Sequence, residues 1–147
     1  MVIGRSLFGM IAIGAAILGS SAASAQNDPI AARKAAMEAV GDQNSIATQM
    51  LNGKQPYSTE AAKKVFDTFA NSATRMPGLF PEDSKSGDTK ALPAIWEKRE
   101  DFNARLAKFA EQSKAAATKV TDLASFKVAI GEVRRNCGGC HKPYRAR

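Results

Sequence analysis

Residues 122–141 read DLASFKVAIGEVRRNCGGCH, a stretch whose apolar positions recur at intervals of three and four residues. Asp122 is a good helix N-cap, because its carboxylate can accept hydrogen bonds from the free N–H groups of the first turn. One face then carries Leu123, Phe126, Ile130, Val133 and Cys137. This spacing predicts an amphipathic helix that buries one face against other helices and leads into two cysteines and a histidine.

The same periodicity occurs in three earlier stretches, residues 29–51, 59–73 and 93–120. Residues 75–92 instead hold prolines and glycines among polar side chains, which predicts a long loop. Four amphipathic helices can bury their apolar faces only against one another, and mostly short connections favour antiparallel neighbours. We therefore expect an all-α fold, an antiparallel up-down-up-down four-helix bundle.

Composition limits the kinds of chemistry that the chain can perform. It has 147 residues, 44% hydrophobic and 24% charged, with a formal net charge of +7. These values are typical of one globular domain and exclude a disordered tail or a collagen-like fibre. Two cysteines are too few for a disulfide scaffold, and one histidine excludes a histidine-rich metal site.

Residues 1–25 have the order of a secretory signal peptide. A basic region ends at Arg5, an apolar stretch covers residues 7–18, and small residues lead to Ala25. The apolar run is too short for a membrane span, and the alternative is an N-terminal anchor helix. We expect cleavage after Ala25, export to the periplasm without membrane insertion, and one domain over residues 26–147.

The C-x-x-C-H spacing of Cys137, Cys140 and His141 is the attachment signature of c-type haem. Two thiols form thioethers with the vinyl groups, and the adjacent imidazole ligates iron from the same side. A thioredoxin-like redox pair would need a βαβ setting, and a zinc site would need further ligands. The sequence therefore predicts one covalently bound haem c per chain.

At this point the chain resembles the class II cytochromes c, the four-helix family that includes cytochrome c′. The resemblance covers essentially all of residues 26–147. It rests on CGGCHKPYR at 137–145, GKQPY at 53–57, PAIW at 93–96, and on Arg33 with Met37. It implies that the haem lies near the C-terminal helix and that His141 is the proximal iron ligand.

The resemblance also implies that the first helix supplies whatever faces the other side of the iron. Counting back sixteen residues from Gly53, the matching position is Met37. The chain therefore looks like the low-spin subgroup, in which a methionine is the sixth ligand and the protein carries electrons. His/Met ligation raises the reduction potential of haem. The alternative is that Met37 only packs, which leaves a five-coordinate iron that binds the diatomic gases NO and CO.

Met50 and Met76 are poorer ligand candidates, because the first lies several turns further along its helix and the second precedes a proline in the loop. Large aromatic side chains are expected to be core residues first and haem contacts second. They are Trp96, Phe102, Phe66 and Phe69.

Arg33 lies four residues before Met37, so the two side chains share a helix face. An arginine on an otherwise apolar face needs an anionic partner, and a haem propionate is the obvious one. The resemblance agrees with this role. The alternative is an arginine whose head group reaches solvent.

The positive charge does not predict nucleic-acid binding, because the chain has no basic stripe interleaved with stacking aromatics. Basic residues instead cluster around the motif, where they could steer an acidic redox partner. They are Arg134, Arg135, Lys142, Arg145 and Arg147.

A homodimer is a further possible assembly. We expect no enzymatic activity, because no nucleophile–base arrangement is visible and the single histidine is committed to iron.

Overall fold

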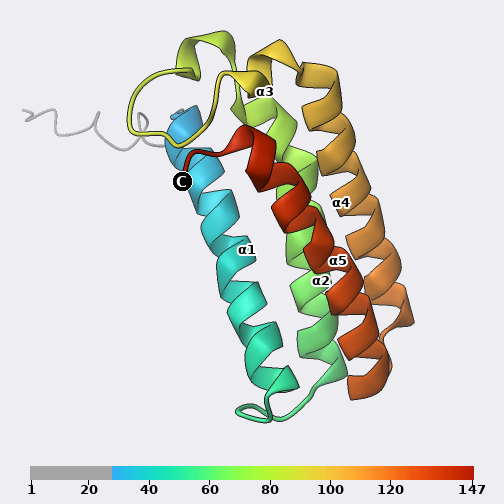
Figure 1. Ribbon diagram of the computed structural model, residues 1–147. Helices are drawn as coiled ribbons and strands as arrows, with labels where there is room; N and C mark the ends of the chain where they lie inside the picture. The colour runs from blue at the N-terminus through green and yellow to red at the C-terminus, as the bar shows by residue number, and fades with distance from the viewer. Residues whose placement is uncertain (1–27) are drawn as a thin grey trace, which may run out of the picture.

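The computed structural model describes residues 28–147, so the signal peptide expected at 1–25 and its cleavage site lie outside the described residues. Within them the fold is an antiparallel four-helix bundle, as predicted (Figure 1). The long helices are α1 (Pro29–Leu51), α2 (Thr59–Arg75), α4 (Arg99–Lys119) and α5 (Leu123–Tyr144). No helix of residues 28–147 combines the length and the apolar character needed to cross a membrane.

Three of the helices begin at side-chain caps that the sequence makes recognisable. Asp28 accepts a 2.8 Å hydrogen bond from the backbone N–H of Ile30 at the start of α1. Ser58 caps α2 in the same way. At α5, Asp122 and Ser125 form a capping box in which each side chain accepts from the other's backbone N–H. Each cap satisfies donors that a helix start would otherwise leave free.

The connection between α1 and α2 turns at Gly53, whose φ is +68°. A residue with a Cβ rarely adopts this left-handed conformation, so glycine suits the position. The chain therefore reverses direction where the sequence predicts the end of the first helix.

The predicted helix over 93–120 is wrong in one respect. It is divided into a short helix, α3 (Ala94–Glu97), and α4, with a break at Lys98, where φ is −121° and ψ is 46°. The indole N–H of Trp96 donates to the carbonyl of Phe80 at 3.1 Å. This contact holds α3 against the preceding loop, so a long-range interaction outweighs local helical periodicity.

The predicted loop is folded back on the end of the bundle. It contains two short 3-10 turns, η2 (Met76–Leu79) and η3 (Glu82–Ser84). Its last part pairs with the C-terminus through an isolated antiparallel bridge between Ala91 and Arg145. The segment that follows the C-x-x-C-H motif is therefore fixed by the loop rather than free in solvent.

Two apolar clusters fill the bundle. The closed-end cluster lies toward the α1–α2 and α4–α5 turns and contains among others Met50, Val65, Phe66, Phe69, Phe109, Phe126 and Ile130. The cluster at the other end contains among others Met76, Phe80, Ile95, Phe102, Leu106 and Tyr144, with Trp96 packed against it. Aromatic residues thus divide between the closed end of the bundle and the end that carries the motif.

Candidate functional site

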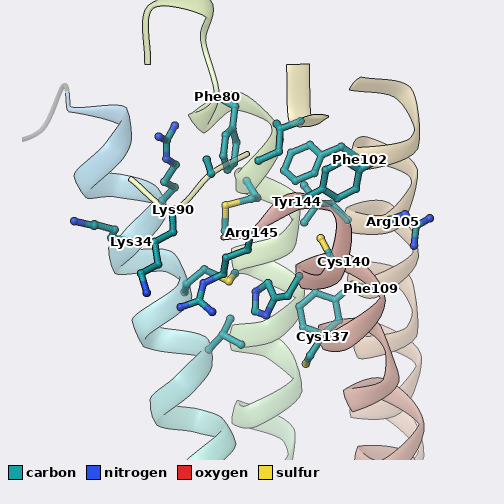
Figure 2. A pocket seen from close by; sticks show the side chains of 18 of the residues that line it. Lys34, Phe80, Lys90, Phe102, Arg105, Phe109, Cys137, Cys140, Tyr144 and Arg145 are labelled. Carbon is teal, nitrogen blue, oxygen red and sulfur yellow. The ribbon is translucent and has the colours of Figure 1, made fainter. Parts of the chain in front are cut away.

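The C-x-x-C-H motif lines a cavity of about 470 Å³ enclosed by α1, α4, α5 and the loop after α2 (Figure 2). Most of its wall is apolar. The aliphatic and aromatic lining residues include Val40, Met76, Phe80, Ile95, Phe102, Leu106 and Phe109. Both the size and the apolar wall are typical of a small-molecule or cofactor pocket.

Cys137, Cys140 and His141 all lie on α5, which continues without interruption through the motif. One helical turn therefore carries all three, and all three line the same cavity. Both thiols are free and half-buried. The geometry agrees with the predicted attachment of one haem through two thioethers and one imidazole.

The ionisation of these groups follows from their surroundings. Burial raises the pKa of both the Cys137 and the Cys140 thiol. Burial, together with the positive charge of Arg145, lowers the pKa of His141. The lower pKa favours the neutral imidazole, whose lone pair is available to a metal, because a metal ligand must be deprotonated.

Met37 is half-buried on α1 and lines the same cavity as His141. The fold thus brings the two predicted iron ligands to one pocket from opposite ends of the sequence. A second thioether also lines it, because Met76, only 3% exposed, comes directly after α2. The sequence placed Met76 in a loop and gave no signal of this position. Met50 lies in the closed-end cluster.

Arg33 is buried at one edge of the cavity, with only 4% of its surface exposed. Its guanidinium donates to the Ser84 hydroxyl at 3.0 Å, the Ser84 carbonyl at 2.9 Å and the Thr89 hydroxyl at 2.7 Å. It also lies 4.7 Å from the ring centre of Phe80. The alternative of a solvated head group is therefore wrong.

The partners of Arg33 in residues 28–147 are neutral, and none of its contacts there is a salt bridge with a carboxylate. Burial lowers the pKa of Arg33, and the negative charge of Asp28 offsets part of this shift. A buried cation whose hydrogen-bond partners are all neutral is costly. An anionic group in the cavity would reduce that cost, which fits a haem propionate, although the contact itself stays a prediction.

Basic side chains dominate the polar part of the wall. Among the described residues that line the cavity, Glu38 is the one acid, and the bases are Arg33, Lys34, Lys90, Arg105 and Arg145. Lys34 pairs with Asp88. In the described part of the chain, the side chains of Lys90 and Arg145 make neither a hydrogen bond nor an ion pair. Figure 2 shows Lys34, Lys90 and Arg145 on one side of the pocket and both cysteines on the other.

The members of the predicted basic cluster around the motif lie in different places. Arg134 donates to the side chain of Asn44 at 2.7 Å and to the hydroxyl of Thr48 at 2.8 Å, so it ties α5 to α1. Arg135 lines a neighbouring groove between α4 and α5, which also reaches Gly139 and Cys140 of the motif. Of the predicted cluster, Arg145 is the member that lines the cavity, and Lys90 lies there as well.

Within residues 28–147, no three His, Cys, Asp or Glu side chains gather as a site for a bare metal ion. A porphyrin brings its own nitrogen donors and needs only axial ligands from the protein. The donor set of this cavity, one imidazole with two thioethers, fits haem iron.

Comparisons with known proteins agree with this geometry. A family model described as Cytochrome C' matches residues 28–145. Cytochrome c' of Rhodopseudomonas palustris is 40% identical over 135 residues, which cover 91% of this chain and 92% of that protein. Cytochrome c-556 of Agrobacterium tumefaciens is 33% identical over 114 residues, 77% of this chain and 93% of that protein.

The likeness extends to three dimensions. The solved structure of cytochrome c' from Rhodopseudomonas palustris superimposes with a TM-score of 0.79 at 39% sequence identity. The superposition covers 83% of this chain and 98% of that chain. The residues matched by the family model include every helix of residues 28–147 and the whole C-x-x-C-H motif.

Proposed function

The chain belongs to the cytochrome c′ family of class II cytochromes c, and from this premise we propose that it carries single electrons with His141 and Met37 as the axial iron ligands. The cofactor is haem c, bound covalently through the C-x-x-C-H motif. Haem supplies the one-electron Fe(III)/Fe(II) couple.

One observation carries this proposal: the side chains of His141 and Met37 line one largely apolar cavity. A neutral imidazole and a thioether together favour the reduced iron more than harder ligands do, which raises the reduction potential. If His141 and Met37 both bound the iron, little rearrangement would accompany a change of oxidation state. The likeness to a cytochrome c-556 as well as to a cytochrome c' is compatible with this ligand set.

The charge distribution supports an orientation for the cofactor. Arg33 is buried with neutral partners only in the described residues, and Lys90 and Arg145 make no side-chain bonds there. We propose that the propionates face this basic side and that Arg33 is one of their contacts. The apolar wall near Phe102 and Phe109 would then face the hydrocarbon edge of the macrocycle.

The exposed cations also suggest the chemistry of a partner. Lys90 and Arg145 are exposed at the edge of the pocket, where a negatively charged redox protein would be attracted and oriented. We propose that such a partner docks on this basic side.

Residues 1–25 support export, so the periplasm is the proposed compartment. No enzymatic activity is proposed, since the relatives are cytochromes and the one histidine is assigned to iron.

Gas binding is the second candidate function. The observation that favours it is the 40% identity to a protein named cytochrome c'. In this case Met37 would only pack in the cavity, or would be displaced by NO or CO.

The optical spectrum of the purified holoprotein, oxidised and reduced, with and without carbon monoxide, separates the two functions. Electron transfer with His141 and Met37 as ligands predicts a low-spin spectrum that carbon monoxide changes little. A high-spin spectrum that shifts at once on adding carbon monoxide would contradict it and favour gas binding.

A further inference from the structure

The last turn of α5 contains a proline, and this proline affects the middle of the C-x-x-C-H motif. Pro143 lies inside α5 and has no N–H group. The carbonyl four residues earlier, at Gly139, therefore loses its helical hydrogen bond. Gly139 lies next to Cys140 and two residues before the iron ligand His141. A helix end with a missing bond at this point needs support from elsewhere.

Arg105 of α4 supplies that support. Its Nη1 donates to the Gly139 carbonyl at 2.9 Å. Its Nε donates to Asp101 Oδ2 at 2.7 Å, one turn earlier on the same helix. The guanidinium is thus held by an ion pair on one side and points its other donor at the carbonyl that Pro143 leaves free.

The same carboxylate oxygen of Asp101 also accepts a hydrogen bond from the hydroxyl of Tyr144. Tyr144 is only 3% exposed, and its ring meets that of Phe102 edge-on at 5.2 Å between centres. Figure 2 shows Tyr144 and Phe102 side by side at the wall of the pocket. Burial raises the pKa of Tyr144, which keeps the hydroxyl protonated as a donor.

The two contacts reach α5 on both sides of His141, because Gly139 precedes it by two residues and Tyr144 follows it by three. The backbone beyond Tyr144 is fixed as well. The N–H of Leu92 donates to the Tyr144 carbonyl at 3.0 Å. The turn that presents the imidazole is therefore held against α4 and the loop.

We propose that Asp101 and Arg105 are positioning residues of the haem site. Through Gly139 and Tyr144 they fix the last turn of α5 and so set the direction in which His141 presents its imidazole to iron. Neither residue acts on the cofactor itself in this role. The inference rests on the proposed function only in taking His141 as the proximal ligand, and it does not depend on Met37.

The test uses the haem-loaded protein and variants that remove particular bonds of this network. Tyr144→Phe removes the hydroxyl and keeps the ring packing and the net charge. Arg105→Met removes both bonds of the guanidinium, whereas Arg105→Lys keeps the charge and one donor. The matched control for the lost charge is Lys108→Met, an exposed cation three residues further along α4.

Asp101→Asn tests the shared carboxylate. Glu100→Gln is its control, because Glu100 is the exposed neighbour on the same helix and makes no side-chain bond in the described residues. All variants are compared in a Met37→Leu background, by the iron–imidazole stretching frequency of the reduced haem in resonance Raman spectra. This signal reports the proximal ligand whichever group occupies the opposite side.

We expect Tyr144→Phe and Arg105→Met to shift this frequency. We also expect them to change the equilibrium constant between Fe(III) and Fe(II), measured through the reduction potential, about threefold to tenfold. Arg105→Lys restores part of the shift, and both controls keep the parent frequency. Lowered unfolding stability with an unchanged frequency and potential would overturn the proposal, because it would leave the network a purely structural role. A wild-type protein that binds carbon monoxide freely would contradict ligation by Met37, but it would not contradict the positioning role of Asp101 and Arg105.

Discussion

Arg33 and Ser84 are joined by two hydrogen bonds, one from Nη1 to the hydroxyl at 3.0 Å and one from Nη2 to the carbonyl at 2.9 Å. Ser84 is itself buried, so this pair fixes the loop after α2 to the first turns of α1. The pair also holds a positive charge at the edge of the cavity. One arginine can thus serve the fold and the cofactor together.

Arg33→Ala is expected to lower both the stability and the reduction potential. Buried acceptors that lose a charged donor cost about 1–3 kcal/mol of unfolding free energy. Loss of a cation beside the cofactor favours the oxidised iron, and loss of the propionate contact changes the pH dependence of the potential. Urea unfolding and potentiometric titration of the holoprotein measure these effects.

Arg75→Ala is the control for this change, because Arg75 is exposed at the end of α2 and carries the same charge. It should leave the potential unchanged. A potential and a pH titration that Arg33→Ala does not alter would rule out the propionate contact.

Phe126→Ala should destabilise the bundle by about 3–5 kcal/mol, because it opens a cavity in a packed core. Phe126 is fully buried and meets Phe66 edge-on at 5.7 Å between ring centres. Val128→Ala, two residues away and 65% exposed, should change the unfolding free energy by less than about 0.5 kcal/mol. If urea unfolding showed that the two variants lose the same free energy of unfolding, the closed-end cluster would not be the main core.

Asp122→Ala should lower the melting temperature at pH 7 by removing the capping box of α5. Hydrogen bonds from Ser125 hold the pKa of Asp122 below its usual value, so its stabilisation is present above the unfolded pKa of about 3.9. That stabilisation is lost as the pH falls through the lower pKa of the folded state. Thermal unfolding at pH 7 and pH 3 should show that the difference in melting temperature between Asp122→Ala and the wild type is smaller at pH 3.

Asp42→Ala serves as the control, since Asp42 is exposed inside α1 and caps no helix. Its melting temperature should follow the wild type at both pH values. If Asp122→Ala lowered the melting temperature as much at pH 3 as at pH 7, the role of the ionised carboxylate would be refuted.

Lys90→Glu should slow the oxidation of the reduced protein by ferricyanide, an anionic reagent that the basic side of the pocket attracts. The slowing should be greatest at low ionic strength and should fade as salt screens the charges. Stopped-flow rates over a range of salt concentrations measure it. Lys119→Glu makes the same charge change at the far end of α4, and equal slowing by both variants would show that only net charge matters.

Local signals in the sequence were enough for the helix starts and for the motif. Asp28, Ser58 and Asp122 act within one turn of their own helices, and so their caps could be predicted. The C-x-x-C-H spacing is equally local. The pairing of His141 with Met37 came instead from the family resemblance, and the fold places both at one cavity.

Features that depend on distant contacts could not be predicted. The break at Lys98 accompanies the contact between Trp96 and the loop at Phe80. Met76 lines the cavity only because the loop folds back after α2. The bond from Arg105 to the motif depends on helix packing, although Pro143 was a visible sign that one carbonyl would need a partner.

The most direct test of Met37 ligation is the electron paramagnetic resonance spectrum of the oxidised holoprotein with Met37→Leu, beside Met76→Leu as control. Both substitutions keep the side-chain volume, and both thioethers line the cavity. Ligation by Met37 predicts a low-spin wild type, a low-spin Met76→Leu, and a high-spin Met37→Leu with a lower reduction potential. A Met37→Leu protein with the spin state and potential of the wild type would contradict the assignment.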